Sequence, residues 1–170
     1  MITVSHDASP AGFTLLEVLV ALLLLTGACL AVAELLVLAA HTLERSRTAA
    51  VATALAAQKV EQLRALAWAY DVDGVPFDEI GLLPAGSLAA DVGGFVDYSD
   101  ESGTLVGGGP PPSVRAAFVR RWSVEQDPGV GPPSSLVIRV VVLHRGQPGP
   151  GGPAWIEVVR MIAVRARRPS

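Results

Sequence analysis

The chain has 170 residues, which suits one modest domain together with a membrane anchor. Its formal net charge of -3 gives no sign of a nucleic-acid partner, and its single cysteine, Cys29, excludes an intramolecular disulfide. Hydrophobic residues make up 51% of the chain, and the excess over a typical soluble domain lies mainly before residue 41.

Residues 1–12 form a short polar leader that ends in Gly12 and contains no Lys or Arg. Basic residues beside a membrane normally hold that end of a span in the cytoplasm, so the leader lacks the usual orientation signal. A long apolar run follows from Phe13, and its first charged residue is Glu17. A charge in hydrocarbon costs about 2.5 to 3.5 kcal/mol on insertion scales, so we expect Glu17 to have a partner or a function.

The stretch Gly12-Phe13-Thr14-Leu15-Leu16-Glu17 resembles the cleavage and methylation motif of type IV prepilins and type II secretion pseudopilins. The resemblance implies that a prepilin peptidase cleaves after Gly12 and that Phe13 becomes the N-methylated first residue. It also implies that Glu17 pairs with the N-terminal amine of a neighbouring subunit during assembly. Such a pair would fix the position of each incoming subunit, because an uncompensated buried charge costs about 3 to 5 kcal/mol.

Residues 18–40 are apolar apart from Thr26 and Glu34, and about 20 such residues span a bilayer as a helix. We expect Glu34 to lie near the outer headgroups or to face a neighbouring subunit. Gly27 weakens a helix by about 1 kcal/mol relative to Ala. It is either a tolerated glycine or a site of local unwinding.

Two other processing sites compete with cleavage after Gly12. The stretch 26–29 partly resembles a lipoprotein signal box that ends at Cys29, but it lacks the usual Leu three residues before the cysteine. The stretch 31–33 fits the small-residue rule of ordinary signal peptidase. Both alternative signals normally have a basic leader, which is missing here, and neither normally contains an acidic residue such as Glu17. We therefore interpret Cys29 as a small hydrophobic residue in the membrane.

Residues 41–47 are polar, and residues 48–70 are rich in strong helix formers with no Gly or Pro. Apolar side chains recur there at mostly three- or four-residue spacing, namely Val51, Leu55, Val60, Leu63, Leu66 and Tyr70. The pattern predicts one helix over residues 13–70. Its 13–40 half would serve as membrane span and filament core, and its 41–70 half is amphipathic.

Residues 71–113 are rich in Gly and Pro and are predicted to form a long connection. The resemblance to pilins implies that this connection is the variable region. A small hairpin is expected within it, with strands 95–98 and 103–106 around a turn at 99–102. Carboxylates cluster near its start, and Asp71, Asp73 and Asp78 are weak metal candidates, since calcium prefers several oxygen ligands. Their spacing does not match an EF-hand loop, and solvation of turns explains them better. No cofactor is indicated.

Three runs rich in β-branched and aromatic residues follow at 114–124, 136–143 and 155–164. They predict an antiparallel sheet over 114–165, with a frayed tail at 166–170. Arg120, Arg121 and Trp122 are consistent with nucleic-acid stacking, but packing of Trp122 on the helix is the simpler interpretation. Alternation puts Arg120 on the same face as Trp122.

The predicted fold class is therefore α+β and pilin-like, a long N-terminal helix with a C-terminal antiparallel sheet packed on its second half. Stretches 55–64 and 120–124 are similar to minor pilins of the PilV type and, less closely, to GspI-type pseudopilins. These resemblances imply a structural or initiating subunit of a type IV pilus, or else a minor pseudopilin of a type II secretion system. A membrane-anchored or secreted β-rich binding module is the alternative from another class, and no nucleophile–base set indicates an enzyme.

The same resemblances imply the partners and the location. The expected partners are other pilin or pseudopilin subunits, prepilin peptidase, the inner-membrane assembly platform and membrane lipid. Before assembly the protein would be a single-pass protein of the bacterial inner membrane with an extracytoplasmic C-terminal domain. After assembly it would lie in the filament, at the tip.

Overall fold

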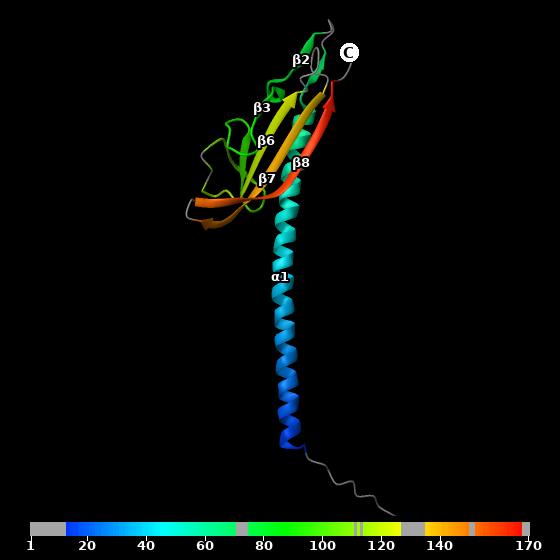
Figure 1. Cartoon of the computed structure of the whole chain (residues 1–170), viewed down its shortest axis with the longest axis vertical. Helices are drawn as coiled ribbons and strands as arrows, with labels where there is room; N and C mark the ends of the chain where they lie inside the picture. The colour runs from blue at the N-terminus through cyan, green and yellow to red at the C-terminus, as the bar shows by residue number, and fades with distance from the viewer. Residues whose placement is uncertain are drawn as a thin grey trace, which may run out of the picture. The chain divides into compact units, whose positions relative to one another are not determined.

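The computed structural model describes residues 13–70, 75–110, 112, 114–126, 135–149 and 152–167. The chain divides into two compact units, Met1–Glu44 and Arg45–Ser170. Helix α1, Leu15–Ala65, contributes residues to both units, and the strands follow it in the chain (Figure 1). The predicted α+β fold, one long helix followed by an antiparallel sheet, is confirmed.

In the first unit, α1 exposes all of its side chains. Its leucines and valines include Leu23, which is 73% exposed, and Leu35, which is 65% exposed. A helix that is apolar on every face is stable only when lipid or other helices cover it. Among the described residues, none covers the apolar surface of this unit.

In the second unit, α1 buries one face only. The buried residues recur every three or four positions, as a single helical stripe requires, and they are Ala52, Leu55, Ala56, Val60 and Leu63. They share a core with Trp122, Ile138 and Val140 of the sheet. The predicted packing of the amphipathic half on one face of the sheet, with Trp122 against the helix, is confirmed.

The helix is shorter than the sequence predicts. It ends at Ala65, and Trp68–Tyr70 form a short strand, β1, that pairs antiparallel with β2, Pro76–Asp78. The prediction of helix as far as Tyr70 is therefore wrong.

Residues that are distant in the sequence bond the backbone just after the end of α1. The Ala67 N–H donates to a Glu79 carboxylate oxygen at 2.7 Å, and the Glu79 N–H donates to the Ala67 carbonyl at 3.2 Å. The Arg165 guanidinium donates to the Leu66 carbonyl at 2.7 Å. These contacts supply partners for backbone groups at the helix end, so helix propensity no longer decides the conformation.

The main sheet is antiparallel, with strand order β5-β4-β6-β7-β8, and β3 also pairs with β6. The strands are β3 (Ala85–Gly86), β4 (Val96–Ser99), β5 (Leu105–Gly108), β6 (Phe118–Gln126), β7 (Ser135–Gly149) and β8 (Gly152–Ala166), and a 3-10 helix, η1, spans Ile80–Leu82. The predicted meander is present as β6-β7-β8. The predicted hairpin is present as β4-β5, and its first strand joins the same sheet by pairing with β6.

The sheet buries side chains on both faces. One face packs on α1. The other carries a smaller core made of Val96, Tyr98, Ala116, Val119, Val141 and Leu143, with Leu88 packed against it. Because every second residue of a strand points to the same face, β6 supplies Trp122 to one core and Val119 to the other.

Candidate functional site

The N-terminal motif forms the start of α1. Thr14 precedes the first helical residue, and its hydroxyl oxygen accepts a hydrogen bond from the Glu17 N–H at 3.3 Å. Thr followed three residues later by Glu is the sequence pattern of a capping box, which satisfies backbone donors at a helix N-terminus. The motif therefore caps the start of α1 in addition to carrying the charge of Glu17. The Thr14-x-x-Glu17 spacing alone was sufficient to predict this capping role.

Phe13 and Glu17 lie on the same surface of the first unit. Phe13 is 83% exposed, and both residues line one shallow hollow of about 350 Å³ whose other walls are Val18, Ala21, Leu22 and Leu25. Gly12 lies outside the described residues. In the part of the chain that the structure describes, Glu17 forms no ion pair. Its carboxylate is open to a cation from another molecule.

The remainder of the first unit has the properties of a membrane span. Among the described helices, α1 is the one that is long and apolar enough to cross a membrane. The Thr26 hydroxyl donates to the Leu22 and Leu23 carbonyls at 2.8 and 2.9 Å, so its polar group is satisfied within the helix. A methyl group added at Gly27 would meet no atom within 4 Å.

A charged cluster lies between α1 and the sheet in the second unit. Asp97 accepts hydrogen bonds on one carboxylate oxygen from Arg120 at 2.6 Å and from Lys59 at 2.9 Å. The other arm of Arg120 donates to the Leu55 carbonyl at 2.8 Å. Burial lowers the pKa of Lys59, and its hydrogen bond to Asp97 opposes that shift. The cluster therefore fixes the position of α1 along β4 and β6.

A second cluster lies on the opposite face of the sheet. The Asp91 carboxylate accepts from the Arg121 Nε at 2.7 Å and from the Tyr98 hydroxyl at 2.9 Å. Burial, together with the hydrogen bond to Asp91, raises the pKa of Tyr98 to about 12. Both clusters consist of groups already bonded to one another, so their role is structural. The sequence signal was two adjacent arginines, Arg120 and Arg121, inside a run rich in β-branched and aromatic residues.

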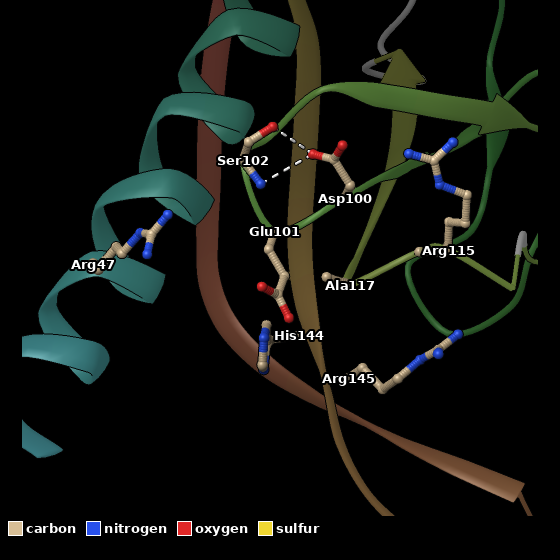
Figure 2. Close-up of a pocket in the computed structure, with 9 residues that line it drawn as sticks. Arg47, Asp100, Glu101, Ser102, Arg115, Ala117, His144 and Arg145 are labelled. Atoms are coloured by element: carbon tan, nitrogen blue, oxygen red, sulfur yellow. Dashed lines mark hydrogen bonds between the residues drawn. The ribbon is translucent and has the colours of Figure 1, made fainter.

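A polar hollow of about 600 Å³ opens at the turn of the β4-β5 hairpin (Figure 2). Asp100 braces this turn, because it accepts from the Ser102 hydroxyl at 2.6 Å and from the Ser102 and Thr104 N–H groups at 3.0 Å each. These hydrogen bonds, that of the Ser102 hydroxyl foremost, lower the pKa of Asp100. Glu101 points towards His144, and Arg47 of α1 projects into the same hollow (Figure 2). The surface offers both charge signs to a polar partner.

The described structure does not test the predicted metal candidates Asp71, Asp73 and Asp78. Asp71 and Asp73 lie outside the described residues, as does the side chain of Asp78. Among the side chains that are described, no three of the types His, Cys, Asp and Glu lie close enough together to hold a metal ion.

The described residues form an α+β protein whose long N-terminal helix is apolar enough in its first half to cross a membrane. The family described as the prokaryotic N-terminal methylation motif matches residues 8–26. Comparison with curated proteins and with solved structures finds no match. The motif indicates a type IV pilin-like or pseudopilin substrate of prepilin peptidase, and together with the long apolar helix it fits anchoring in the inner membrane.

Proposed function

We propose that this protein is a minor pilin, a structural or initiating subunit at the tip of a type IV pilus. One observation carries the proposal: the methylation motif at residues 8–26 leads directly into a helix whose apolar side chains are all exposed over residues 15–40. A signal that is merely removed needs no continuation into a folded domain. Here the same helix, α1, continues to Ala65 and supplies the core of the second unit.

Assembly follows from the chemistry of the N-terminus. Cleavage after Gly12 creates an amine on Phe13, and N-methylation leaves that amine able to carry a positive charge. The amine of an incoming subunit would pair with Glu17 of a neighbour, where both charges are removed from water. The apolar side chains that leave the lipid would then be covered by the helices of neighbouring subunits.

The second unit would act as a rigid head on this assembly element. Its two charged clusters fix the helix and the loop segment around Asp91 to the sheet. The hollow beside Asp100 is the polar surface through which the head would contact other subunits. No step of this function requires bond chemistry by the protein itself.

N-terminal mass analysis of the mature protein is the most direct test. We expect a chain that begins at N-methylated Phe13. A lipid on Cys29, or a chain that begins at Glu34, would instead support a membrane-anchored or secreted β-rich binding module.

A second experiment tests assembly. We expect Glu17→Ala to abolish entry into filaments, and Glu44→Ala, a matched change of an exposed acidic residue on the same helix, to assemble normally. Normal assembly of the Glu17 variant would contradict the ion-pair mechanism. Recovery of the protein from secretion pseudopili rather than pili would support the alternative of a type II minor pseudopilin.

A further inference from the structure

Glu34 is the second carboxylate in the apolar part of α1. Its side chain is exposed, and its neighbours one turn away on the same face are apolar, Leu30 being 67% exposed and Leu38 64% exposed. In the described part of the chain, Glu34 forms no ion pair. Once neighbouring helices replace water or headgroups around it, this charge needs a cation from another molecule.

Glu34 cannot share the neighbour that satisfies Glu17. The two residues are 17 positions apart, which on an α-helix corresponds to about 25 Å along the axis and about 100° around it. A helix whose amine lies beside Glu17 therefore passes a different side of α1 from the one that Glu34 occupies. Glu34 belongs to a separate contact.

A second copy of this chain is poorly suited to that contact. Residues 13–44 contain no Lys or Arg, and the first is Arg45. If the Phe13 amine of one copy pairs with Glu17 of another, the two helices are offset by four residues. The residue of the other copy at the level of Glu34 is then Leu30 or Leu38, depending on which copy provides the amine.

Other offsets between two copies are unfavourable as well. Bringing Arg45 level with Glu34 requires a shift of about 16 Å, and bringing His41 level requires about 10 Å. Either shift draws the polar segment 41–47 of one copy into the apolar layer.

We propose that Glu34 selects a different subunit, another pilin-like chain that carries a Lys or Arg within its own apolar helix. The inference rests on the proposed function, since it requires assembly through the helix. It assigns the two acidic residues different tasks: Glu17 receives the terminal amine that processed subunits share, and Glu34 recognises one particular neighbour. A charge pair within an apolar contact gives specificity because a wrong partner leaves both charges uncompensated.

Photo-crosslinking in the full-length chain tests the proposal. A benzoylphenylalanine at position 38 lies on the Glu34 face, and one at position 36 lies on the far side as a control. We expect position 38 to crosslink to a different pilin-like chain, through a peptide from its apolar helix that contains Lys or Arg. Glu34→Gln should lower this yield about tenfold, the equivalent of about 1.4 kcal/mol, whereas Glu44→Gln should not.

The charge pair can then be reversed. Glu34→Lys should abolish the crosslink, and replacing the partner's basic residue by Glu should restore it. The inference is overturned if position 38 crosslinks only to a second copy, if the captured peptide has no Lys or Arg, or if Glu34→Gln leaves the yield unchanged. The last result would mean that Glu34 is solvated at the headgroups.

The two proposals fail in different ways. If the mature chain still begins at Phe13 and assembly still depends on Glu17, a negative crosslink refutes only the role of Glu34. If the chain is not cleaved after Gly12, the proposed function itself is wrong. Because Glu34→Gln removes a charge from the apolar segment, the variant should insert into the membrane at least as well as the natural chain.

Discussion

The two units of this protein use the same helix in opposite ways. Leu35 in the first unit is 65% exposed, whereas Leu55 in the second unit is 6% exposed and packs against the sheet. Both are leucines on α1, so local helix propensity does not distinguish them. What differs is the covering surface: the sheet covers Leu55, whereas no described residue covers Leu35.

The charged residues divide in the same way. Asp97 in the second unit is bonded to both Lys59 and Arg120. Glu17 and Glu34 in the first unit form no ion pair within the described residues. We therefore expect substitutions in the second unit to change the stability of the fold, and substitutions in the first unit to change assembly.

The largest expected effect on stability is that of Asp97→Ala. It leaves the cations of Lys59 and Arg120 uncompensated beneath the helix and should lower the free energy of unfolding by about 4 kcal/mol. Urea denaturation of the full chain in detergent, followed by tryptophan fluorescence, measures this change. Lys59→Met leaves Arg120 paired with Asp97, so it should lower the free energy of unfolding by clearly less than Asp97→Ala does. Glu61→Ala, which removes an exposed ion pair with Arg64, should change stability by less than about 1 kcal/mol.

The next largest effect is expected for a core substitution in the second unit, compared with a similar substitution on the exposed helix of the first unit. Ile138→Ala empties part of a fully buried site and should cost about 3 kcal/mol. Leu35→Ala removes a similar apolar volume from the first unit and should leave the same unfolding transition unchanged. A comparable loss of stability for both variants would contradict the division into two units.

A smaller effect concerns the hairpin turn and depends on pH. The pKa of Asp100 is lowered in the folded protein by hydrogen bonds from Ser102 and Thr104. Its contribution is therefore complete above the unfolded pKa, about 3.9, and is lost as the pH falls through the folded value. Asp100→Asn should melt below the natural chain at pH 6, and the difference should shrink towards pH 2. Glu101→Gln, a change of the neighbouring exposed carboxylate, is the matched control. A difference that stays constant with pH would contradict the assignment.

The smallest effect is expected for Gly27→Ala. The site has room for a methyl group, so the change should stabilise the first unit's helix by about 1 kcal/mol and leave unfolding of the second unit unaltered. Slower amide hydrogen exchange around residue 27 would show this. If exchange slows and filament entry also fails, Gly27 is a site of unwinding rather than a tolerated glycine.

The sequence by itself determined the elements whose signals are local. The Gly12–Glu17 motif, the apolar run and the three β-branched runs each depend on residues close together in the chain, and they yielded the α+β fold and the candidate processing site. The Thr14–Glu17 capping pattern was also readable locally. Periodicity correctly placed Leu55 and Val60 on the face that packs against the sheet.

Only the tertiary structure decided the features that depend on distant partners. The helix ends at Ala65 because Glu79 and Arg165 bond the backbone that follows it, and no local pattern records those bonds. Asp97 became the partner of Arg120 only through the pairing of β4 with β6, and the partner of Lys59 only through the packing of α1 on the sheet. The physical reason is that backbone bonding and charge compensation depend on proximity in space. Helix propensity and hydrophobic periodicity depend only on neighbours in the chain.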